Sequence, residues 1–344
     1  MSSSSVLNYS ECSKTINIFP QYVFDEDLMP DCGVEIDAIC TEIHEACKGW
    51  GKDSNRLIKA IGNTVAEDRF KIALRYPELY SKSLTKLMKH ECGNSDFGVA
   101  TQFLSVGPVE AECMMLKKAM DGMGSDTTVL YSILCGRSNE DMVLLKKTYF
   151  KMYTEDLVAR MSSEWLSGDL KATLLSSTQA AEEEFNPDYH TDEKAAKDAE
   201  ILYKVGQGRW GTDGSAMVKI VVLSPPKYLK MINAVYCDKY GYTLMKAFEK
   251  ELNKKGGDAA KFTVGMKLKP YDTIATLIKK SCKGLGTREL LLTSCIIRYQ
   301  DLMGHVYFAH EDLFEKGIHK RIRDETSGEY KKLLLALLNK ICPE

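Results

Sequence analysis

The chain has 344 residues, of which 44% are hydrophobic and 27% are charged, enough sequence for one large domain or several small repeats. With 46 Lys and Arg against 48 Asp and Glu, the formal charge is −2. No overall basic field therefore exists to hold nucleic acid or an anionic membrane by Coulomb attraction alone, and we expect no nucleic-acid partner. An anionic partner would be reached through local basic groups or a bridging cation.

Targeting signals and cysteine usage predict a cytoplasmic protein. The N-terminal stretch MSSSSVLNYSECSK lacks the basic and then apolar layout of a secretory signal, and no apolar stretch reaches membrane-spanning length. Eleven Cys without any CxxC pair indicate reduced, mostly buried thiols rather than a disulfide framework.

The apolar spacing along the chain is helical, and alternating β-branched runs are scarce. Leu57, Ile58 and Ile61 share one helical face, and EYKKLLLALLNKIC near the C-terminus has a broad apolar face. The stretch KVGQGRWGTDGSAM at 204–217 contains Gly-x-Gly-x-x-Gly, but the helical pattern EKAAKDAEILYKV precedes it. A dinucleotide site needs a strand at that place, so the pattern predicts a different kind of loop.

This glycine-rich loop recurs four times. Its relatives are CKGWGKDS at 47–54, MDGMGSDT at 120–127 and CKGLGTRE at 282–289. The first and last intervals between successive loops are nearly equal, and the longer middle interval contains an acid-rich connector. We predict a tail at 1–30, repeats at 31–104, 105–178, 199–265 and 266–344, and a linker at 179–198.

A carboxylate follows each loop at nearly constant distance. Counted from the second glycine of the loop, the distance is identical in the first three repeats and one position shorter in the fourth, and the acids are Glu91, Glu164, Glu251 and Glu325. Carbonyl oxygens of a glycine turn plus one carboxylate are hard ligands that suit Ca²⁺ better than Mg²⁺. One carboxylate per loop leaves coordination positions for a lipid phosphate, so we expect weak calcium binding that tightens on an anionic surface.

The residues around the glycines suggest membrane contact. Large apolar side chains lie between the two glycines of every loop, namely Trp50, Met123, Trp210 and Leu285. Basic neighbours that could contact phosphates are Lys48, Lys52, Arg209 and Lys283. Such tips suit the headgroup boundary of a bilayer, although packing of each tip against its own repeat stays open.

The loop K-G-x-G-T with an acid at this fixed distance downstream, repeated four times, resembles the annexins over roughly residues 31–343. GRWGTDGSAMVKIV and KGLGTRELLLTSCIIR with IRDETSGEYKKLLLALL carry the resemblance most strongly. It implies an all-α fold of four five-helix repeats in a curved right-handed superhelical disk. It also implies reversible, calcium-dependent docking on acidic phospholipids as a peripheral membrane protein, and no active site. The cysteine content and the divergence between repeats look more like a non-animal annexin, for example a giardin.

The resemblance implies three backbone carbonyls and one carboxylate per site, and the third loop is one residue longer than the others. The implied ligands are Cys47, Gly49, Gly51 and Glu91; Met120, Gly122, Gly124 and Glu164; Gly206, Arg209, Gly211 and Glu251; and Cys282, Gly284, Gly286 and Glu325. Cys47 and Cys282 would contribute main-chain oxygen only.

Some positions depart from the family pattern. Lys52 stands where the family has Thr and adds a positive charge beside the first site, which we expect to be the weakest. The family's Arg after the second helix is matched by Arg137 and Arg298 but is missing from IGNTVAED and LSPPKY, which predicts different packing in repeats one and three. In repeat four, Asp324 is an alternative to Glu325.

Other functions find little support. GWGKDS only partly matches a phosphate-binding loop, no EF-hand loop is present, and no catalytic arrangement can be picked out from spacing. A calcium-independent cytoskeletal or structural scaffold of the same fold is the main alternative. A tail-binding or cytoskeletal protein partner and self-association on membranes stay open. The tail also stays open: it is either a flexible segment or a docked arm that is modified at Ser.

Overall fold

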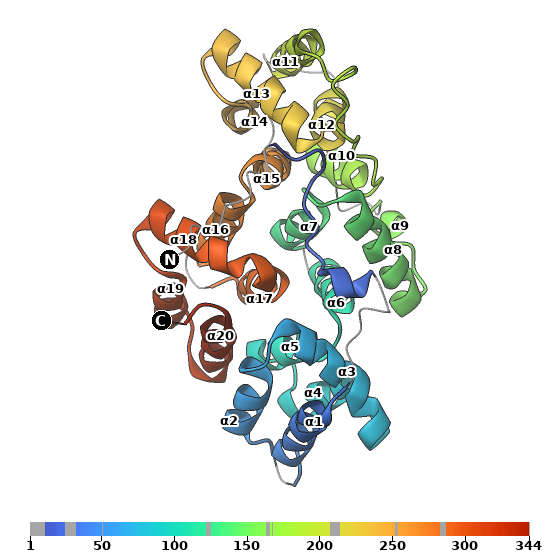
Figure 1. Cartoon of the computed structure of the whole chain (residues 1–344), viewed down its shortest axis with the longest axis vertical. Coiled ribbons are helices and arrows are strands. Elements are labelled where there is room, and N and C mark those ends of the chain that lie inside the picture. Colours follow the sequence, from blue (N-terminus) through green and yellow to red (C-terminus); the bar gives the residue numbers. More distant parts are fainter. Residues whose placement is uncertain are drawn as a thin grey trace. The chain divides into compact units, whose positions relative to one another are not determined.

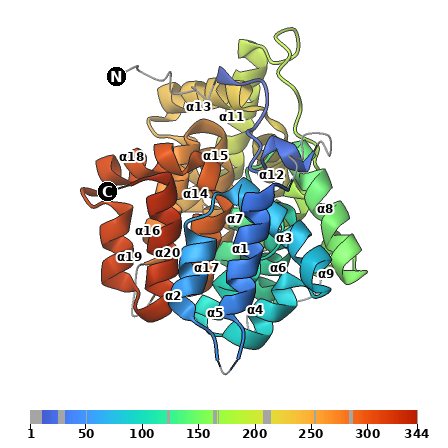
Figure 2. The same cartoon turned by 60° about the horizontal axis from the view of Figure 1, so that its bottom comes forward.

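The computed structural model describes residues 11–24, 32–49, 51–121, 125–162, 166, 168–206, 214–251, 254–282 and 287–343. Over these residues the chain is helical without a strand (Figures 1 and 2). None of the helices in these ranges is both long and apolar enough to cross a bilayer.

The helices form four successive groups of five. The first two groups are α1 (Val34–Ala46), α2 (Ser54–Leu57) with the π-turn η4 (Ile58–Gly62), α3 (Ala66–Tyr80), α4 (Leu84–Cys92) and α5 (Asp96–Phe103); then α6 (Pro108–Asp121), α7 (Thr127–Leu134), α8 (Asn139–Tyr153), α9 (Leu157–Met161) and α10 (Gly168–Ser177). The last two are α11 (Asp192–Gly206), α12 (Gly214–Leu223), α13 (Pro226–Tyr240), α14 (Leu244–Glu251) and α15 (Lys254–Leu268); then α16 (Pro270–Ser281), α17 (Glu289–Arg298) with η5 (Gln300–Leu302), α18 (Met303–Phe314), α19 (Ile318–Glu325) and α20 (Gly328–Ile341). A short 3₁₀ turn, η2 (Gln21–Val23), precedes them.

The third helix of every repeat ends in the same way. Its C-terminal cap adopts the left-handed conformation at Ser81, Thr154, Gly241 and Glu315, with φ between 52° and 79°. Only one of these four residues is glycine, although non-glycine residues seldom adopt this conformation. A cap repeated at equivalent positions therefore marks the four groups as copies of one structural unit.

The chain divides into two compact units. The described residues within 1–18 and 122–273 form unit 1, and those within 19–121 and 274–344 form unit 2. Unit 1 has an apolar core built by α11 to α15, with Leu202, Tyr228, Ile232, Phe248 and Val264 almost fully buried. In unit 2, α20 of the fourth repeat packs on η4 and α5 of the first repeat (Figure 2). Each unit thus combines helices from more than one repeat.

Part of the N-terminal tail is docked on unit 1. The Thr15 side chain donates to Glu182 Oε2 at 2.5 Å and its N–H donates to Glu182 Oε1 at 2.6 Å. The Ile18 N–H donates to Asp141 Oδ2 at 2.6 Å. Thr15 and Ile18 are buried. The sequence left two alternatives open for the tail, a flexible segment and a docked arm. Residues 11–18 are docked.

The following residues of the tail lie on unit 2. Phe19 is buried, and the ring of Tyr22 stacks on Phe70 of α3 with 5.7 Å between the ring centroids. Residues 1–10 and 25–31, which include Ser2 to Ser5, are outside the described part of the chain, so modification of the tail at Ser stays a prediction.

A buried cation lies at the end of the second helix in repeats two and four, as the family pattern predicts. Arg137 donates to Ile133 O at 3.1 Å and pairs with the buried Asp141 at 3.3 Å. Arg298 ends α17 and pairs with Glu112 of α6 at 2.7 Å, where both side chains are about 2% exposed.

Repeats one and three obtain this cation from other helices. In repeat one, Arg69 of α3 donates to Thr64 O and lies 3.4 Å from Ile61 O, at the end of η4. In repeat three, Lys267 of α15 donates to carbonyls at the end of α12. The predicted difference in packing therefore lies in which helix supplies the cation. A cationic side chain therefore lies at the end of the second helix in all four repeats.

Candidate functional site: the interhelical loops

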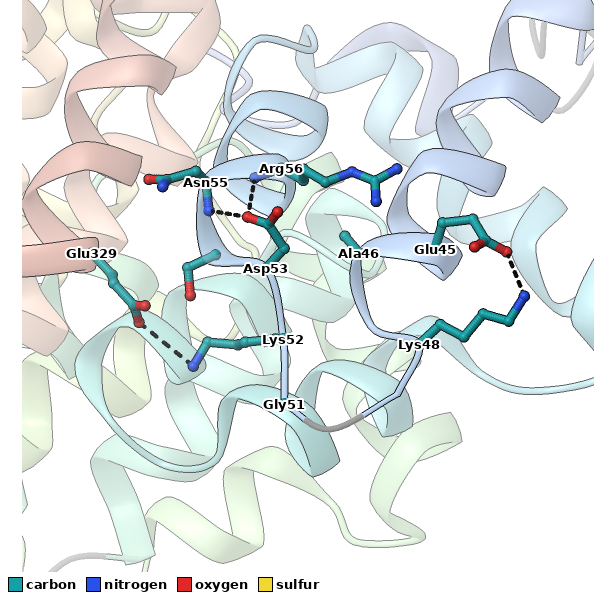
Figure 3. Close-up of a pocket in the computed structure, with 10 residues that line it drawn as sticks. Glu45, Ala46, Lys48, Gly51, Lys52, Asp53, Asn55, Arg56 and Glu329 are labelled. Carbon is teal, nitrogen blue, oxygen red and sulfur yellow. Dashed lines mark hydrogen bonds and ion pairs between the residues drawn. The ribbon is translucent and has the colours of Figure 1, made fainter.

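Loop one joins α1 to α2 (Figure 3). It is closed by a main-chain hydrogen bond, in which Asp53 N donates to Ala46 O at 2.8 Å. Gly49 and Gly51 have φ of 102° and 81°, and a Cβ at either position would meet no atom within 4 Å. Glycine is thus required here by backbone conformation and not by crowding. The Asp53 carboxylate caps α2 by accepting from Asn55 N and Arg56 N.

Loop four has the same closure. Arg288 N donates to Ser281 O at 2.8 Å, across an interval of the same length. Cys282, like Cys47, is buried directly after the first helix of its repeat. The rest of this loop, Lys283, Gly284, Leu285 and Gly286, lies outside the described residues.

The distant acids of repeats one and four act electrostatically on their loops. Burial raises the pKa of the Cys47 thiol to about 12, and the nearby Cys92 and Glu91 add to this rise. Burial likewise raises the pKa of Cys282, and Glu325 adds to it. Each acid is therefore close enough to the first residue of its loop to act on it electrostatically. The Glu91 side chain is only 17% exposed, and its Oε1 lies 2.8 Å from Nδ1 of the exposed His90.

Asp324 and Glu325, the two candidate acids of repeat four, have different partners. Its carboxylate pairs with Lys316 at 2.8 Å, and this hydrogen bond and charge lower the pKa of Asp324. Glu325 ends α19, and its main-chain oxygen accepts a hydrogen bond from Thr287 Oγ1 of loop four at 2.6 Å. Glu325 thus contacts the loop through its main chain, and which of the two carboxylates is a ligand stays a prediction.

Loops two and three are described only at their ends. Met120 is buried in the last turn of α6, and Asp126 caps α7 by accepting from Thr128 N and Val129 N, as Asp53 does for α2. Gly206 ends α11 and Glu251 ends α14. The predicted residues outside the described ranges are Gly122, Met123, Gly124, Glu164, Arg209, Trp210 and Gly211; Trp50 of loop one is also outside them.

The two basic residues of loop one differ in exposure. The Lys48 side chain is 67% exposed and lies 3.2 Å from Glu45, on the solvent side of the loop (Figure 3). The Lys52 side chain is 20% exposed and pairs with Glu329 of α20 at 3.5 Å. Lys48 is therefore available to a phosphate, whereas Lys52 is engaged within the protein.

A pair of stacked rings near the end of the first helix, where the loop begins, was not predicted from the sequence. One turn before the first implied ligand, His44 stacks on Tyr80 with 4.0 Å between the centroids, and Tyr203 stacks on Tyr240 with 3.6 Å. In repeat four the same place is taken by Lys279, whose Nζ lies 4.1 Å from the centroid of the Phe314 ring. The sequence does contain a signal for this contact, because an aromatic residue follows Tyr76, Tyr236 and His310 by one helical turn. The signal becomes visible only when the repeats are aligned with one another. These pairs fix the end of the first helix, from which the loop starts.

His310 gives the fourth repeat a pH-dependent stability. Its Nδ1 donates to Lys316 O at 2.8 Å and its Nε2 accepts from Arg321 Nε at 3.0 Å, so the buried ring is held neutral. Burial, and then the Arg321 charge, lower the pKa of His310 from 6.5 to about 4. Between these values the unfolded chain binds the proton and the folded chain does not, so stability falls as the pH falls.

We expect the free energy of unfolding to drop by about 2 kcal/mol between pH 7 and pH 5 because of this group. Urea unfolding at both pH values measures it, and His310→Gln should remove most of this pH-dependent difference. His90→Gln, at an exposed position, should leave it unchanged. An equal pH dependence in the parent and in H310Q would show that another group is responsible.

The donor chemistry of the loops fits a hard divalent cation. The described residues contain no group of three or more His, Cys, Asp or Glu side chains that could hold a metal ion. Loop one offers instead main-chain carbonyls in an open glycine turn, and the sequence provides one carboxylate for each loop at nearly constant distance. Oxygen ligands of this kind suit calcium and leave room for a further oxygen ligand from outside. These features define a four-repeat helical protein whose candidate ligands lie on interhelical loops.

Comparison with known proteins agrees with this class. The family profile described as Annexin matches residues 38–97, 111–176, 197–259 and 274–337, and the chain belongs to the annexin family. Annexin A13 of mouse is 31% identical over 89% of this chain and 96% of its own length. The predicted all-α fold of four annexin repeats is confirmed.

Solved structures share the fold. A structure titled annexin III aligns with a TM-score of 0.81 at 24% identity, over 94% of this chain and 97% of that chain. A calcium-bound annexin (Sm)1 aligns with a TM-score of 0.75 at 22% identity, over 98% and 97%. The annexin family is known for calcium-dependent binding to phospholipids, and its members are in general not enzymes.

Proposed function

We propose that this annexin binds calcium through its four interhelical loops and, with calcium bound, docks reversibly on acidic phospholipid membranes. The carbonyl ligands are those of the glycine turns, and the carboxylates are Glu91, Glu164, Glu251 and Glu325. The calcium ion supplies a bridging positive charge between these oxygens and a lipid phosphate. The chain would then act as a peripheral organiser or scaffold of a membrane surface from the cytoplasm.

One observation carries this proposal. In both repeats whose loop ends and acid side chain are described, the acid predicted from the constant spacing adds to the raised pKa of the first residue of its own loop. In repeat four, Thr287 also connects the loop to Glu325 by a hydrogen bond. A carboxylate next to a turn that requires glycine is the arrangement that a carbonyl-rich calcium site needs.

The charge of the chain supports a bridging ion. At a net charge of −2 the chain has little overall attraction for an acidic bilayer. Four loops acting together would give avidity, because docking of one loop raises the effective concentration of the next. We therefore expect a steep dependence of membrane binding on calcium.

Co-sedimentation with liposomes tests the proposal. The full chain should pellet with phosphatidylserine vesicles in calcium, return to the supernatant with a chelator, and ignore phosphatidylcholine vesicles. Pelleting that is unaffected by the chelator would favour the calcium-independent scaffold. No pelleting under any condition would contradict the membrane function.

A further inference from the structure

The residue directly after the second glycine differs in loop one. It is a hydroxyl residue in loops two, three and four, namely Ser125, Thr212 and Thr287, and it is Lys52 in loop one. In loop four this residue connects the loop to its own acid-bearing helix, through the hydrogen bond from Thr287 Oγ1 to Glu325 O. Because both loops close with the same main-chain hydrogen bond, the two positions can be compared directly.

Lys52 connects its loop to a different repeat. Its ammonium group lies 3.5 Å from Glu329 Oε2 in the first turn of α20 and 5.4 Å from the centroid of the Phe97 ring (Figure 3). A second contact joins α20 to the helix that follows loop one, since Lys332 Nζ of α20 donates to Asn55 Oδ1 of α2 at 3.3 Å. All of these residues belong to unit 2. Loop one is thus fixed by repeat four.

The ammonium group lies close to the candidate cation site. Lys52 directly follows Gly51, an implied ligand of loop one, and both residues line the same surface pocket together with Glu329 (Figure 3). The positive charge of Lys52 therefore lies beside the site, where a calcium ion would be repelled.

We propose that Lys52 is an internal cation that holds loop one in its closed form through Glu329 and sets the calcium affinity of site one below that of the other loops. This inference rests on the proposed function, and it adds how one of the four sites is regulated. Site one would fill last, after the loops that carry a hydroxyl at this position.

Terbium can report on loop one alone. The chain has three Trp, and replacing Trp165 and Trp210 by Phe leaves Trp50, between the two glycines of loop one, as the only indole that can sensitise terbium emission. In this background Lys52→Thr should lower the terbium concentration that gives half-maximal Trp50-sensitised emission by about tenfold, as expected from removal of one unit charge near a multivalent cation in a partly solvated site.

Three further variants separate charge from geometry. Lys52→Met removes the charge without adding a hydroxyl and should also increase calcium affinity. Lys52→Arg keeps the charge and should behave like the parent. Lys48→Thr removes a charge from the exposed side of the same loop and should change the affinity much less. Circular dichroism confirms that each variant keeps its helix content.

The outcomes distinguish the inference from the function on which it rests. Liposome binding of the unmodified chain that depends on calcium, together with no change in the Trp50-sensitised signal on Lys52→Thr, would overturn the inference and leave the function standing. A gain as large with Lys48→Thr as with Lys52→Thr would also overturn it, since the general charge of the loop would then be the cause. Absence of calcium-dependent liposome binding in the unmodified chain would contradict the function, and the inference with it.

Discussion

Replacing Lys267 by Met is expected to lower the free energy of unfolding by about 3–5 kcal/mol, the range found when one partner of a buried ion pair is removed. Its ammonium group lies 3.0 Å from Val221 O, 2.7 Å from Val222 O, 2.7 Å from Ser224 O and 2.7 Å from Glu182 Oε2, and the side chain is 2% exposed. Burial lowers the pKa of Lys267, and the Glu182 carboxylate opposes this. Met would leave three carbonyls and a carboxylate in the interior without their donor.

Urea unfolding of the two proteins measures this loss, and Lys261→Met is the matched control. Lys261 lies on the same helix α15 and pairs at the surface with Glu249 at 3.3 Å and Asp258 at 3.4 Å. Removing it should cost no more than about 1 kcal/mol. Equal losses in K261M and K267M would show that the buried contacts contribute no more than a surface pair.

A double variant apportions the effect of the buried pair. Glu182→Gln removes the carboxylate charge, which also accepts from Thr15. If the ion pair matters as proposed, Lys267→Met should cost less in the Glu182→Gln background than in the parent, because no buried charge is left alone. Additive losses would contradict coupling of the two groups.

The cations of the four repeats show where sequence reasoning succeeds and where it stops. Arg137 and Arg298 lie at or close to the ends of their second helices, so the pattern of one repeat was sufficient to find them. Arg69 comes from the next helix of its repeat, and Lys267 comes from α15, although the carbonyls that it binds lie at the end of α12. A linear sequence motif cannot predict a side chain that another helix of the fold contributes.

For the loops, too, the sequence predicted local features but not the partners that come from another repeat. The glycines and the distance to the acid are local or periodic signals. The glycines coincide with positive φ at Gly49 and Gly51, whereas the return of each carboxylate to its loop stays a prediction. The partner of Lys52 was not predictable, because Glu329 lies near the other end of the sequence and belongs to another repeat. For the same reason Lys52 was predicted as a phosphate contact, although its side chain is engaged inside unit 2.

The acids themselves should control membrane binding. We expect the double variant Glu251→Gln and Glu325→Gln to raise the calcium concentration for half-maximal binding to phosphatidylserine vesicles by about 100-fold. The estimate assumes roughly tenfold for each carboxylate removed, since the charge count of the ligands sets calcium affinity. Loss of two of four docking points also weakens avidity, so the calcium dependence should become less steep.

The matched control removes two carboxylates at neighbouring positions. Glu249 lies on α14 and pairs with Lys246 at 3.0 Å, and Asp324 lies on α19 and pairs with Lys316 at 2.8 Å. Glu249→Gln with Asp324→Asn changes the net charge by the same amount and on the same two helices. Because these acids already have a cation as partner, their removal should shift the calcium requirement by less than about threefold.

The comparison separates coordination from the general field of the protein. If both double variants moved the calcium requirement equally, the acids would act only through net charge, and the carboxylate of each loop would not be a ligand. If only the E251Q/E325Q variant moved it while helix content and thermal unfolding stayed unchanged, the constant spacing between loop and acid would acquire a direct chemical meaning. It would then be the length of chain that returns an oxygen ligand to the turn from which its repeat begins.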